Sequence, residues 1–361
     1  MIYLVLFVST FLLSAIFTPV AILVSKKFGI MDDPKAHKHP ALLHRKAIAR
    51  GGGISIFAAI FFVSLFFLPK TKEVLGIFLG GFFLAVVGLI DDKIDLNKWV
   101  KLLVQFWAAL VVVGAGVGIA FITNPISLLG GPDGLSVLRL DSIRLVFNFL
   151  GDHSVLLLAD LFAILWIVWV INMINFSSGV DGQMPGIVLV SLLVLFIVSL
   201  RFGGDPEQFT VSKLAIISAG STLGFLIFNF APAKIFPGDS GSYLLGFLVA
   251  VLSILSGAKV GTAVLVMAVP LADGVFTIIR RISSGKSPFV GDSGHLQHRL
   301  LQLGLSQRQV ALFYWGLCAI LGASALMLDS AGKLFAGIVI AIVVFGGLIW
   351  LNITLPIKDQ K

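Results

Sequence analysis

Two adjacent acids, Asp91 and Asp92, end an apolar stretch that begins at Val74 and contains no charged residue before them. Neighbouring carboxylates repel each other unless a metal ion or a basic group lies between them. If the segment is helical, Asp95 lies one turn later and shares a face with both acids. The pair therefore predicts either a solvated helix end or the start of a metal-dependent active site.

A third acid, Asp239, stands between two apolar stretches in the run Phe-Pro-Gly-Asp-Ser-Gly-Ser at residues 236–242. Mg²⁺ prefers oxygen ligands and commonly takes one or two carboxylates together with a substrate phosphate. An acid in a Pro/Gly turn is therefore a candidate magnesium ligand. A helix N-cap formed by Asp239 or Ser240 is the competing interpretation.

Two polar loops carry hydrogen-bonding groups. Residues 172–184 combine amides, hydroxyls, two glycines and Asp181 without a basic residue, which suits recognition of a polar ring or a sugar. An Asx-turn between two helices is the alternative.

Residues 25–51 are rich in basic side chains and histidines and end in three glycines, which allow close approach of a backbone or a phosphate. A flexible basic loop beside a membrane is the alternative there.

The segment 280–308 is basic and contains His295 and His298, which share a face if they lie on a helix. A zinc site at these two histidines would need a third nitrogen or thiolate ligand, and none is evident. The basic neighbours would also repel a cation. Anion binding fits better, because Arg and His side chains form charge-assisted hydrogen bonds with phosphate. Asp273 follows Pro270 inside an apolar stretch. There it has either a structural role at a break in the helix or a place in the lining of a cavity.

The elements that position these residues are apolar helices. Hydrophobic residues make up 58% of the 361 residues and charged residues 12%, which excludes a soluble globular protein. We predict an all-α polytopic membrane protein with about 10–11 transmembrane helices, as one integral-membrane domain over residues 1–361. The eleven apolar spans are 2–24, 52–68, 74–90, 102–122, 155–171, 185–200, 213–230, 242–256, 260–279, 309–328 and 334–353.

The distribution of positive charge predicts the orientation. If the N-terminus lies outside and the helices alternate, one face collects the C-terminal tail and loops 25–51, 91–101, 172–184, 231–241 and 280–308. These segments hold 18 of the 26 Lys and Arg residues, so that face is predicted to be cytoplasmic. The net charge of +8 then favours anionic lipid head groups or an anionic substrate as partners rather than nucleic acid.

The outer segment 123–152 fits a short hairpin or an interfacial helix, but not a soluble domain. Cys318 is the only cysteine, so no disulfide and no thiolate metal site can form within the chain.

The predicted cytoplasmic face combines acids for a divalent cation, basic groups for phosphates and a polar turn. Metal-assisted phosphoryl transfer to or from a lipid uses all three.

In these motifs and their order, the whole chain resembles the polyprenyl-phosphate N-acetylhexosamine-1-phosphate transferases, the glycosyltransferase 4 family. The motifs that carry the resemblance are His44 to Arg50 with its glycines, Asp91 and Asp92, Asn172 to Gly182, Phe236 to Ser242, and His295-Leu-Gln-His298-Arg-Leu.

The resemblance implies a Mg²⁺-dependent transfer of a sugar-1-phosphate from a UDP-activated amino sugar to a polyprenyl phosphate lipid, with release of UMP. By the same resemblance the catalytic residues are Asp91, Asp92 and Asp239, of which Asp239 and Asp91 place the metal while Asp91 and Asp92 activate the lipid phosphate. The implied substrate-binding residues are Asn175, Asp181 and Phe236, the last two at the uracil, and Arg45, Arg50, His295 and His298 at the pyrophosphate.

Three departures from the family pattern stand out. Ser178 replaces an acid that is often catalytic, Gln297 replaces a histidine and can donate a hydrogen bond but carry no charge, and Ala47 and Ala49 replace prolines, which loosens that loop.

The resemblance favours an N-acetylglucosamine-type enzyme of the plasma (inner) membrane that begins assembly of a cell-envelope glycan, with a homodimer as one assembly. The alternatives are a phospho-N-acetylmuramoyl-pentapeptide transferase of peptidoglycan synthesis, a weakened homologue that binds the nucleotide sugar, and a cation-coupled transporter. A transporter predicts acids near the membrane midplane, whereas most acids here cluster at one end.

Overall fold

The fold is known from a computed structural model of the chain, which describes residues 1–34, 46–124, 137–148, 152–256, 259–285, 287 and 294–354. The predicted phosphate-binding residue Arg45 and residue His44 of the same motif lie outside these ranges.

Each of the eleven predicted apolar spans contains a helix, but the span 102–122 is helical only to Gly114 and its last two residues, from Phe121, form part of a short strand. Eight helices are long and apolar enough to cross a membrane, and the pair α10 and α11, bent by 81°, makes a ninth candidate within the described part of the chain. Two of the spans form shorter helices, α2 with 15 residues and α4 with 17. The chain is therefore a multi-pass, all-α membrane protein, as predicted. The helices are α1 (Ile2–Phe28), α2 (Gly53–Phe67), α3 (Lys72–Ile94), α4 (Lys98–Gly114), α6 (Leu157–Phe176), α7 (Gln183–Leu200), α8 (Pro206–Asn229), α9 (Gly238–Leu255), α10 (Lys259–Val266), α11 (Ala268–Ser283), α12 (Leu296–Gln302), α13 (Gln307–Met327) and α14 (Ser330–Thr354).

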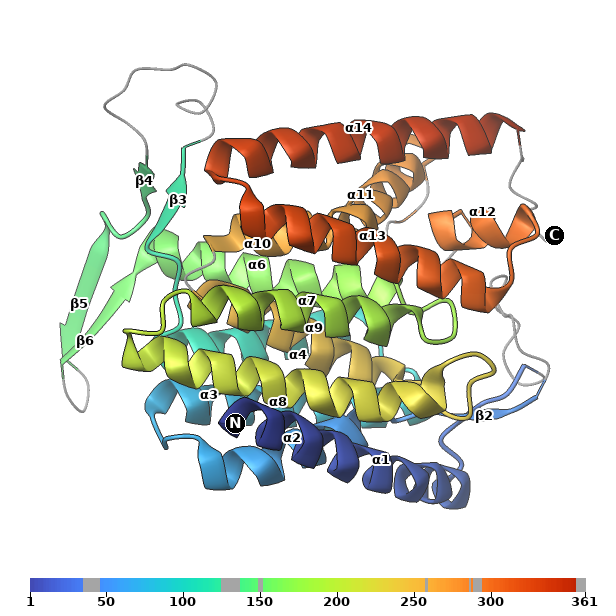
Figure 1. The fold of residues 1–361 in the computed structure, drawn as a ribbon, viewed down its shortest axis with the longest axis horizontal. Coiled ribbons are helices and arrows are strands. Elements are labelled where there is room, and N and C mark those ends of the chain that lie inside the picture. The colour runs from blue at the N-terminus through green and yellow to red at the C-terminus, as the bar shows by residue number, and fades with distance from the viewer. Residues whose placement is uncertain are drawn as a thin grey trace.

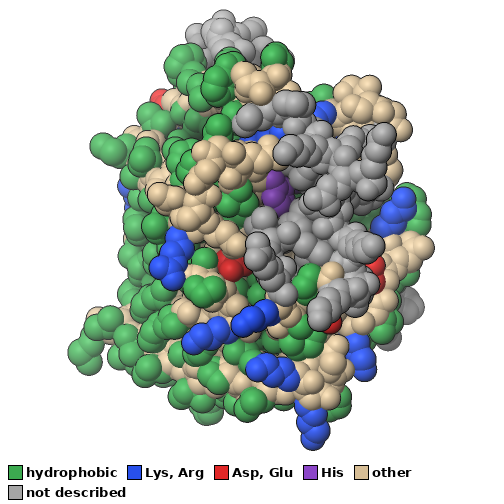
Figure 2. Space-filling view, turned by 90° about the vertical axis from the view of Figure 1, so that its right-hand side faces the viewer, with side chains coloured by type: hydrophobic (Ala, Val, Ile, Leu, Met, Phe, Trp, Pro, Cys, Tyr) green, Lys and Arg blue, Asp and Glu red, His purple; other side chains and the backbone are tan. Residues whose placement is uncertain are grey.

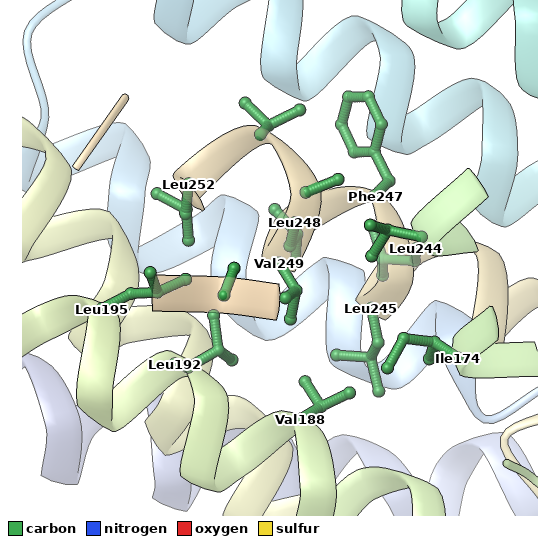
Figure 3. Packing of buried hydrophobic residues seen from close by; sticks show 14 of the residues in the cluster. Ile174, Val188, Leu192, Leu195, Leu244, Leu245, Phe247, Leu248, Val249 and Leu252 are labelled. Carbon is green, nitrogen blue, oxygen red and sulfur yellow. The ribbon is translucent and has the colours of Figure 1, made fainter. Parts of the chain in front are cut away.

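Helix α9 forms the centre of the bundle, packed against α2, α3, α6 and α7 (Figure 1). Its sequence is apolar on all sides, which is typical of a buried helix. Figure 3 shows its side chains interlocking with those of α7 and α6. The residues in this contact include Leu245, Val249 and Leu252 of α9, Val188, Leu192 and Leu195 of α7, and Ile174 of α6. Asp239 therefore lies in the first turn of a buried helix at the centre of the bundle.

Two glycines set the contact between α8 and α1. A Cβ atom at Gly220 would lie 2.4 Å from the Phe7 carbonyl oxygen, and one at Gly224 would lie 2.4 Å from the Phe11 carbonyl oxygen. Glycines four residues apart lie on one face of a helix and let two backbones approach closely, which is how apolar helices associate in lipid.

Replacing Gly220 by alanine is expected to destabilise the protein, because the new methyl group overlaps the α1 backbone and forces the two helices apart. We expect a loss of about 1–3 kcal/mol, measured as a lower Tm in detergent. Gly337→Ala in α14 is the matched control, because its Cβ would meet nothing within 4 Å. Equal Tm values for the two variants would contradict this account of the contact.

Short antiparallel strand pairs occupy both ends of the bundle. The segment that is predicted to lie outside contains two of them, β3 (Phe121–Thr123) with β4 (Val137–Arg139) and β5 (Arg144–Asn148) with β6 (Asp152–Leu156). The described residues of the segment 123–152 thus pair as strands, as the hairpin interpretation predicts, while residues 125–136 and 149–151 lie outside the described ranges. At the opposite end, near α12, β1 (Met31–Asp32) pairs with β2 (Ile48–Ala49) (Figure 1).

The structure corrects the interpretation of Asp91 and Asp92 as a solvated helix end. Helix α3 continues past them to Ile94, and both residues are buried, at 3% and 6% exposure. Asp95 takes the terminal position instead, with a left-handed φ of 49° that the short polar side chain of an aspartate tolerates. The acid pair thus faces the interior of the bundle.

Candidate active site

Asp92 caps the start of α9 from a different helix. Its Oδ1 accepts the backbone N–H of Asp239 at 2.8 Å, and its Oδ2 accepts the backbone N–H of Ser240 at 3.3 Å and the Ser240 hydroxyl at 2.9 Å. The first N–H groups of a helix have no partner within the helix and attract negative charge. Asp92 therefore holds the turn that carries Asp239, and its two oxygens are used in doing so.

Glycines permit the close approach that this cap requires. A Cβ atom at Gly53 or Gly88 would lie 2.3–2.4 Å from the backbone of Ser240, and one at Gly238 would lie 2.2 Å from the Asp92 carboxylate. The N–H groups of Gly52 and Gly53 donate to the carbonyl oxygens of Phe236 and Pro237. Gly52 and Gly53 thus lie against the backbone of residues 236–240, which is one of the two predicted alternatives, and their N–H groups donate to the chain itself.

Asp91 faces a different set of partners. Its Oδ1 accepts the Leu96 N–H at 2.7 Å and lies 2.9 Å from the Lys101 ammonium, and its Oδ2 accepts the Tyr243 hydroxyl at 3.3 Å. Its carboxyl group also comes within hydrogen-bonding reach of the Asp239 carboxyl group. Two adjacent acids thus have different surroundings, since Asp92 meets backbone donors whereas Asp91 meets a cation and a second acid.

Asp239 completes this group of polar side chains. Its Oδ1 accepts the Asn175 side-chain N–H at 2.9 Å, and its Oδ2 lies 3.4 Å from the Lys101 ammonium. About a quarter of its side chain, 24%, is exposed, so the carboxylate is accessible from outside. The predicted residues Asp91, Asp92, Asn175 and Asp239 therefore converge in one place, from α3, α6 and α9.

The site suits a hard divalent cation that substrate phosphate helps to coordinate. Among the described residues, no three His, Cys, Asp or Glu side chains come together as a complete metal-ligand set. Mg²⁺ rarely needs one, because it commonly uses one or two carboxylates plus waters and phosphates. The Lys101 ammonium lies between Asp91 and Asp239, where it takes the position of a cation. The donor chemistry therefore fits a magnesium ion held by Asp91 and Asp239.

Arg50 adds positive charge beside these acids. Its Nε lies 3.7 Å from Asp32 Oδ2, and its carbonyl accepts the Ser25 hydroxyl at 2.6 Å. Burial alone would lower the pKa of Arg50, but the carboxylates of Asp32, Asp92, Asp239 and Asp91 together raise it above its ordinary value. Arg50 thus stays positively charged next to the acidic group.

Asp181 and Phe236 lie in turns that are tied to neighbouring elements. Asp181 Oδ2 accepts the Ala233 N–H at 2.9 Å, and the Gln307 side-chain amide donates to the Asp181 carboxylate. Phe236 donates its N–H to the Ala49 carbonyl at 2.8 Å. Ala49, predicted to loosen its loop by replacing a proline, is therefore paired with both β1 and the turn before α9.

The histidine-rich segment packs against the 172–184 loop. Gln297 Nε2 donates to the Phe176 carbonyl at 3.3 Å, so this side chain does donate a hydrogen bond, as we predicted. Gln297 Oε1 accepts the Gln183 side-chain N–H at 2.7 Å. A Cβ atom at Gly179 would lie 3.4 Å from His298 Nε2. The structure thus brings together two motifs that are more than one hundred residues apart.

Ser178 does not replace the missing acid directly. It is exposed, and its hydroxyl donates to the Asn175 carbonyl at 2.6 Å. Sequence reasoning also missed Lys101 and Tyr243 as members of the site. The signal for Lys101 was its place in the first turn of the helix that follows the acid pair, and the signal for Tyr243 was its place one helical turn after Asp239.

The distribution of charge is visible on the surface. Figure 2, which views the α12 end of the bundle, shows acidic and histidine side chains inside a rim of Lys and Arg side chains. This arrangement matches a site that holds a cation in its interior and attracts anions from its surroundings.

Comparison with known proteins gives consistent matches over most of the chain. The model of the family described as Glycosyl transferase family 4 matches residues 74–257. The probable undecaprenyl-phosphate N-acetylglucosaminyl 1-phosphate transferase of Bacillus subtilis is 32% identical over 335 residues, covering 91% of this chain and 85% of that protein. The decaprenyl-phosphate N-acetylglucosaminephosphotransferase of Mycolicibacterium smegmatis is 30% identical, with 88% and 81% covered. The undecaprenyl-phosphate alpha-N-acetylglucosaminyl 1-phosphate transferase of Escherichia coli K12 is 29% identical, with 84% and 77% covered. The matched range 74–257 includes the acids that converge in the structure.

Proposed function

This chain belongs to glycosyl transferase family 4, and on that premise we propose that it transfers N-acetylglucosamine 1-phosphate from a UDP-activated sugar to a polyprenyl phosphate. The relatives that support this are named as N-acetylglucosaminyl-1-phosphate transferases acting on undecaprenyl or decaprenyl phosphate. The observation that carries the proposal is the position of the Asp91 and Asp239 carboxylates on the Lys101 ammonium, with the Asn175 side-chain amide donating to Asp239.

In the proposed reaction, a phosphate oxygen of the lipid attacks the β-phosphorus of the UDP-sugar. The bond between this phosphorus and the bridging oxygen breaks, and UMP leaves with that oxygen. A bound Mg²⁺ would neutralise phosphate oxygens that otherwise repel the attacking phosphate. Asp91 and Asp239 would hold it, because their carboxylates face each other and Lys101.

The other side chains take roles that follow from their contacts. Lys101 and Arg50 place positive charge beside the phosphates, where it stabilises the transition state electrostatically. Asp92 keeps the α9 turn in place rather than activating the lipid phosphate, since its oxygens accept N–H and hydroxyl groups of Asp239 and Ser240. This changes the role that the family resemblance implied for Asp92.

The other candidate functions receive less support. The relatives above are N-acetylglucosamine enzymes, which disfavours a muramoyl-pentapeptide donor. A transporter would need acids along a path through the bundle, whereas Asp91, Asp92 and Asp239 share one end of α3 and α9. We place the site at the cytoplasmic face of the plasma membrane, because the predicted inner loops hold most of the basic residues.

Release of UMP tests the function. Purified protein with undecaprenyl phosphate, Mg²⁺ and UDP-N-acetylglucosamine is expected to release UMP and form a lipid-linked sugar diphosphate. EDTA is expected to stop the reaction and added Mg²⁺ to restore it. UDP-N-acetylmuramoyl-pentapeptide serves as the competing donor.

The outcomes separate the alternatives. Turnover only with the pentapeptide donor would favour the peptidoglycan enzyme. Binding of the UDP-sugar without UMP release, in protein that remains monodisperse, would favour the weakened homologue and would point to the loss of an acid at Ser178.

A further inference from the structure

His295 is enclosed by partners on both of its ring nitrogens. Its Nδ1 lies 3.0 Å from Asp273 Oδ2 and 3.3 Å from the Thr277 hydroxyl, and its Nε2 lies 3.4 Å from the terminal guanidinium nitrogen of Arg281. Asp273, Thr277 and Arg281 all lie on α11, while His295 is the N-cap of α12. All four side chains are buried, none more than 6% exposed.

The partners determine where the imidazole carries its proton. A carboxylate accepts, so Nδ1 must donate to Asp273, whereas a guanidinium only donates, so Nε2 must accept from Arg281. An imidazolium would point a second N–H at Arg281 and place two positive charges in contact. These two contacts are complementary to a neutral imidazole with its proton on Nδ1.

Asp273 also fixes the beginning of α12. Its second oxygen, Oδ1, accepts the Leu296 backbone N–H at 2.8 Å. One carboxylate thus holds both the imidazole and the backbone of the residue that follows it. The Phe176 ring packs beside His295 at 5.9 Å and below the Arg281 guanidinium at 5.9 Å, next to the 172–184 loop.

We propose that Asp273 is a positioning residue that keeps His295 in the neutral Nδ1–H form, so that His295 orients the Arg281 guanidinium instead of binding phosphate as an imidazolium. This revises the role at the pyrophosphate that the family resemblance implied for His295. The inference rests on the proposed function only for its kinetic consequence, because the protonation state is a property of the protein without substrate.

The first test is nuclear magnetic resonance of protein labelled with ¹⁵N in its six histidines, with His295→Gln used to assign the His295 signals. In the native protein, Nδ1 of His295 is expected to be protonated and Nε2 unprotonated. A signal from an imidazolium, or a proton on Nε2, would overturn the proposal. Thr277→Val should leave the proton on Nδ1, because Asp273 remains.

Asp273→Asn is the diagnostic variant. In Asp273 the Leu296 N–H meets Oδ1 and the imidazole meets Oδ2, whereas an amide has an oxygen at only one of these two positions. With the oxygen kept by Leu296, the amide N–H₂ faces Nδ1, so the proton of His295 is expected to move to Nε2 and to displace Arg281. Asp160→Asn is the matched control, since Asp160 also accepts a backbone N–H, from Leu156 at 2.9 Å, near the other end of the bundle.

Kinetics separate positioning from a merely structural role. If UMP release is observed, Asp273→Asn should raise KM for the UDP-sugar by about 10- to 100-fold, the effect of a lost charge-assisted hydrogen bond, with KM for the lipid unchanged. A structural defect would instead lower kcat and leave both KM values alone. In a His295→Gln background, Asp273→Asn should have little further effect on KM, because Asp273 acts through His295.

An Asp273→Asn protein with an unchanged His295 signal and unchanged KM would overturn the proposal while leaving the proposed function intact. Absence of UMP release in the native protein would overturn the proposed function, and the resonance experiment would still decide the protonation of His295.

Discussion

Replacing Asp239 by alanine is expected to reduce UMP release by about 10³-fold while the protein remains folded. Asp239 and Asp91 are the two carboxylates proposed to hold Mg²⁺, and both lie beside the Lys101 ammonium, so the loss of Asp239 removes half of the proposed protein ligands. A metal ion supplies several kcal/mol of charge stabilisation in the transition state, and each 1.36 kcal/mol is about tenfold in rate. Initial rates of UMP release measure the effect, with Tm as the check on folding.

The matched control is Asp95→Asn. Asp95 Oδ1 also contacts the Lys101 ammonium, at 3.0 Å, but its side chain is 80% exposed and lies outside the group of buried acids. Asparagine tolerates the left-handed backbone at this position as aspartate does. We therefore expect near-native turnover from Asp95→Asn. Full activity in Asp239→Ala, or an equal loss in both variants, would rule out the metal assignment.

The helices of this protein follow from local sequence, because runs of apolar residues long enough to cross a bilayer can satisfy their backbone only as helices. Each of the eleven predicted spans contains a helix for this reason, although α4 ends at Gly114, before the end of the predicted span 102–122. Helix ends were harder to predict. The boundary near Asp91 was placed too early, since the hydropathy of α3 ends at the first charge while the helix continues to Ile94.

The membership of the site was partly predictable. Asp91, Asp92, Asn175 and Asp239 were singled out by residue type and motif, and the structure brings them together. Lys101 and Tyr243 were missed, because a lysine near a helix start and a tyrosine in an apolar helix have ordinary local explanations. Only the packing of α4 and α9 beside α3 places them against Asp91.

The division of roles between neighbouring acids was not predictable at all. Which carboxylate meets backbone N–H groups and which meets a cation depends on the docking of α9, about 150 residues later in the chain. The same applies to Asp273 and His295, which lie on different helices. Sequence spacing describes faces within one helix, whereas these contacts join separate helices.

Asp91→Asn and Asp92→Asn are therefore expected to fail in different ways. In Asp92→Asn the new amide N–H₂ faces backbone donors of Asp239 and Ser240, so at least one buried N–H loses its acceptor. We expect destabilisation by about 1–3 kcal/mol, seen as a lower Tm, together with reduced turnover as the α9 turn shifts.

In Asp91→Asn the contacts can be kept. The amide oxygen can accept the Leu96 N–H, and the amide N–H₂ can donate to the Tyr243 hydroxyl, which accepts as well as it donates. The charge that faces Lys101 and Asp239 is nevertheless lost. We expect a near-native Tm with strongly reduced turnover, partly restored by raising the Mg²⁺ concentration, because the remaining carboxylate binds the ion more weakly.

The magnesium titration separates the two variants most sharply. Asp92→Asn should not recover at high Mg²⁺, since its defect lies in the position of Asp239 and not in the number of metal ligands. If both variants lost Tm equally, or if Mg²⁺ restored both, then the two acids would share one role and the cap on α9 would not explain why Asp92 is needed. The opposite pattern, with Asp91→Asn unstable and Asp92→Asn rescued by Mg²⁺, would exchange the roles that the hydrogen bonds assign to the two residues.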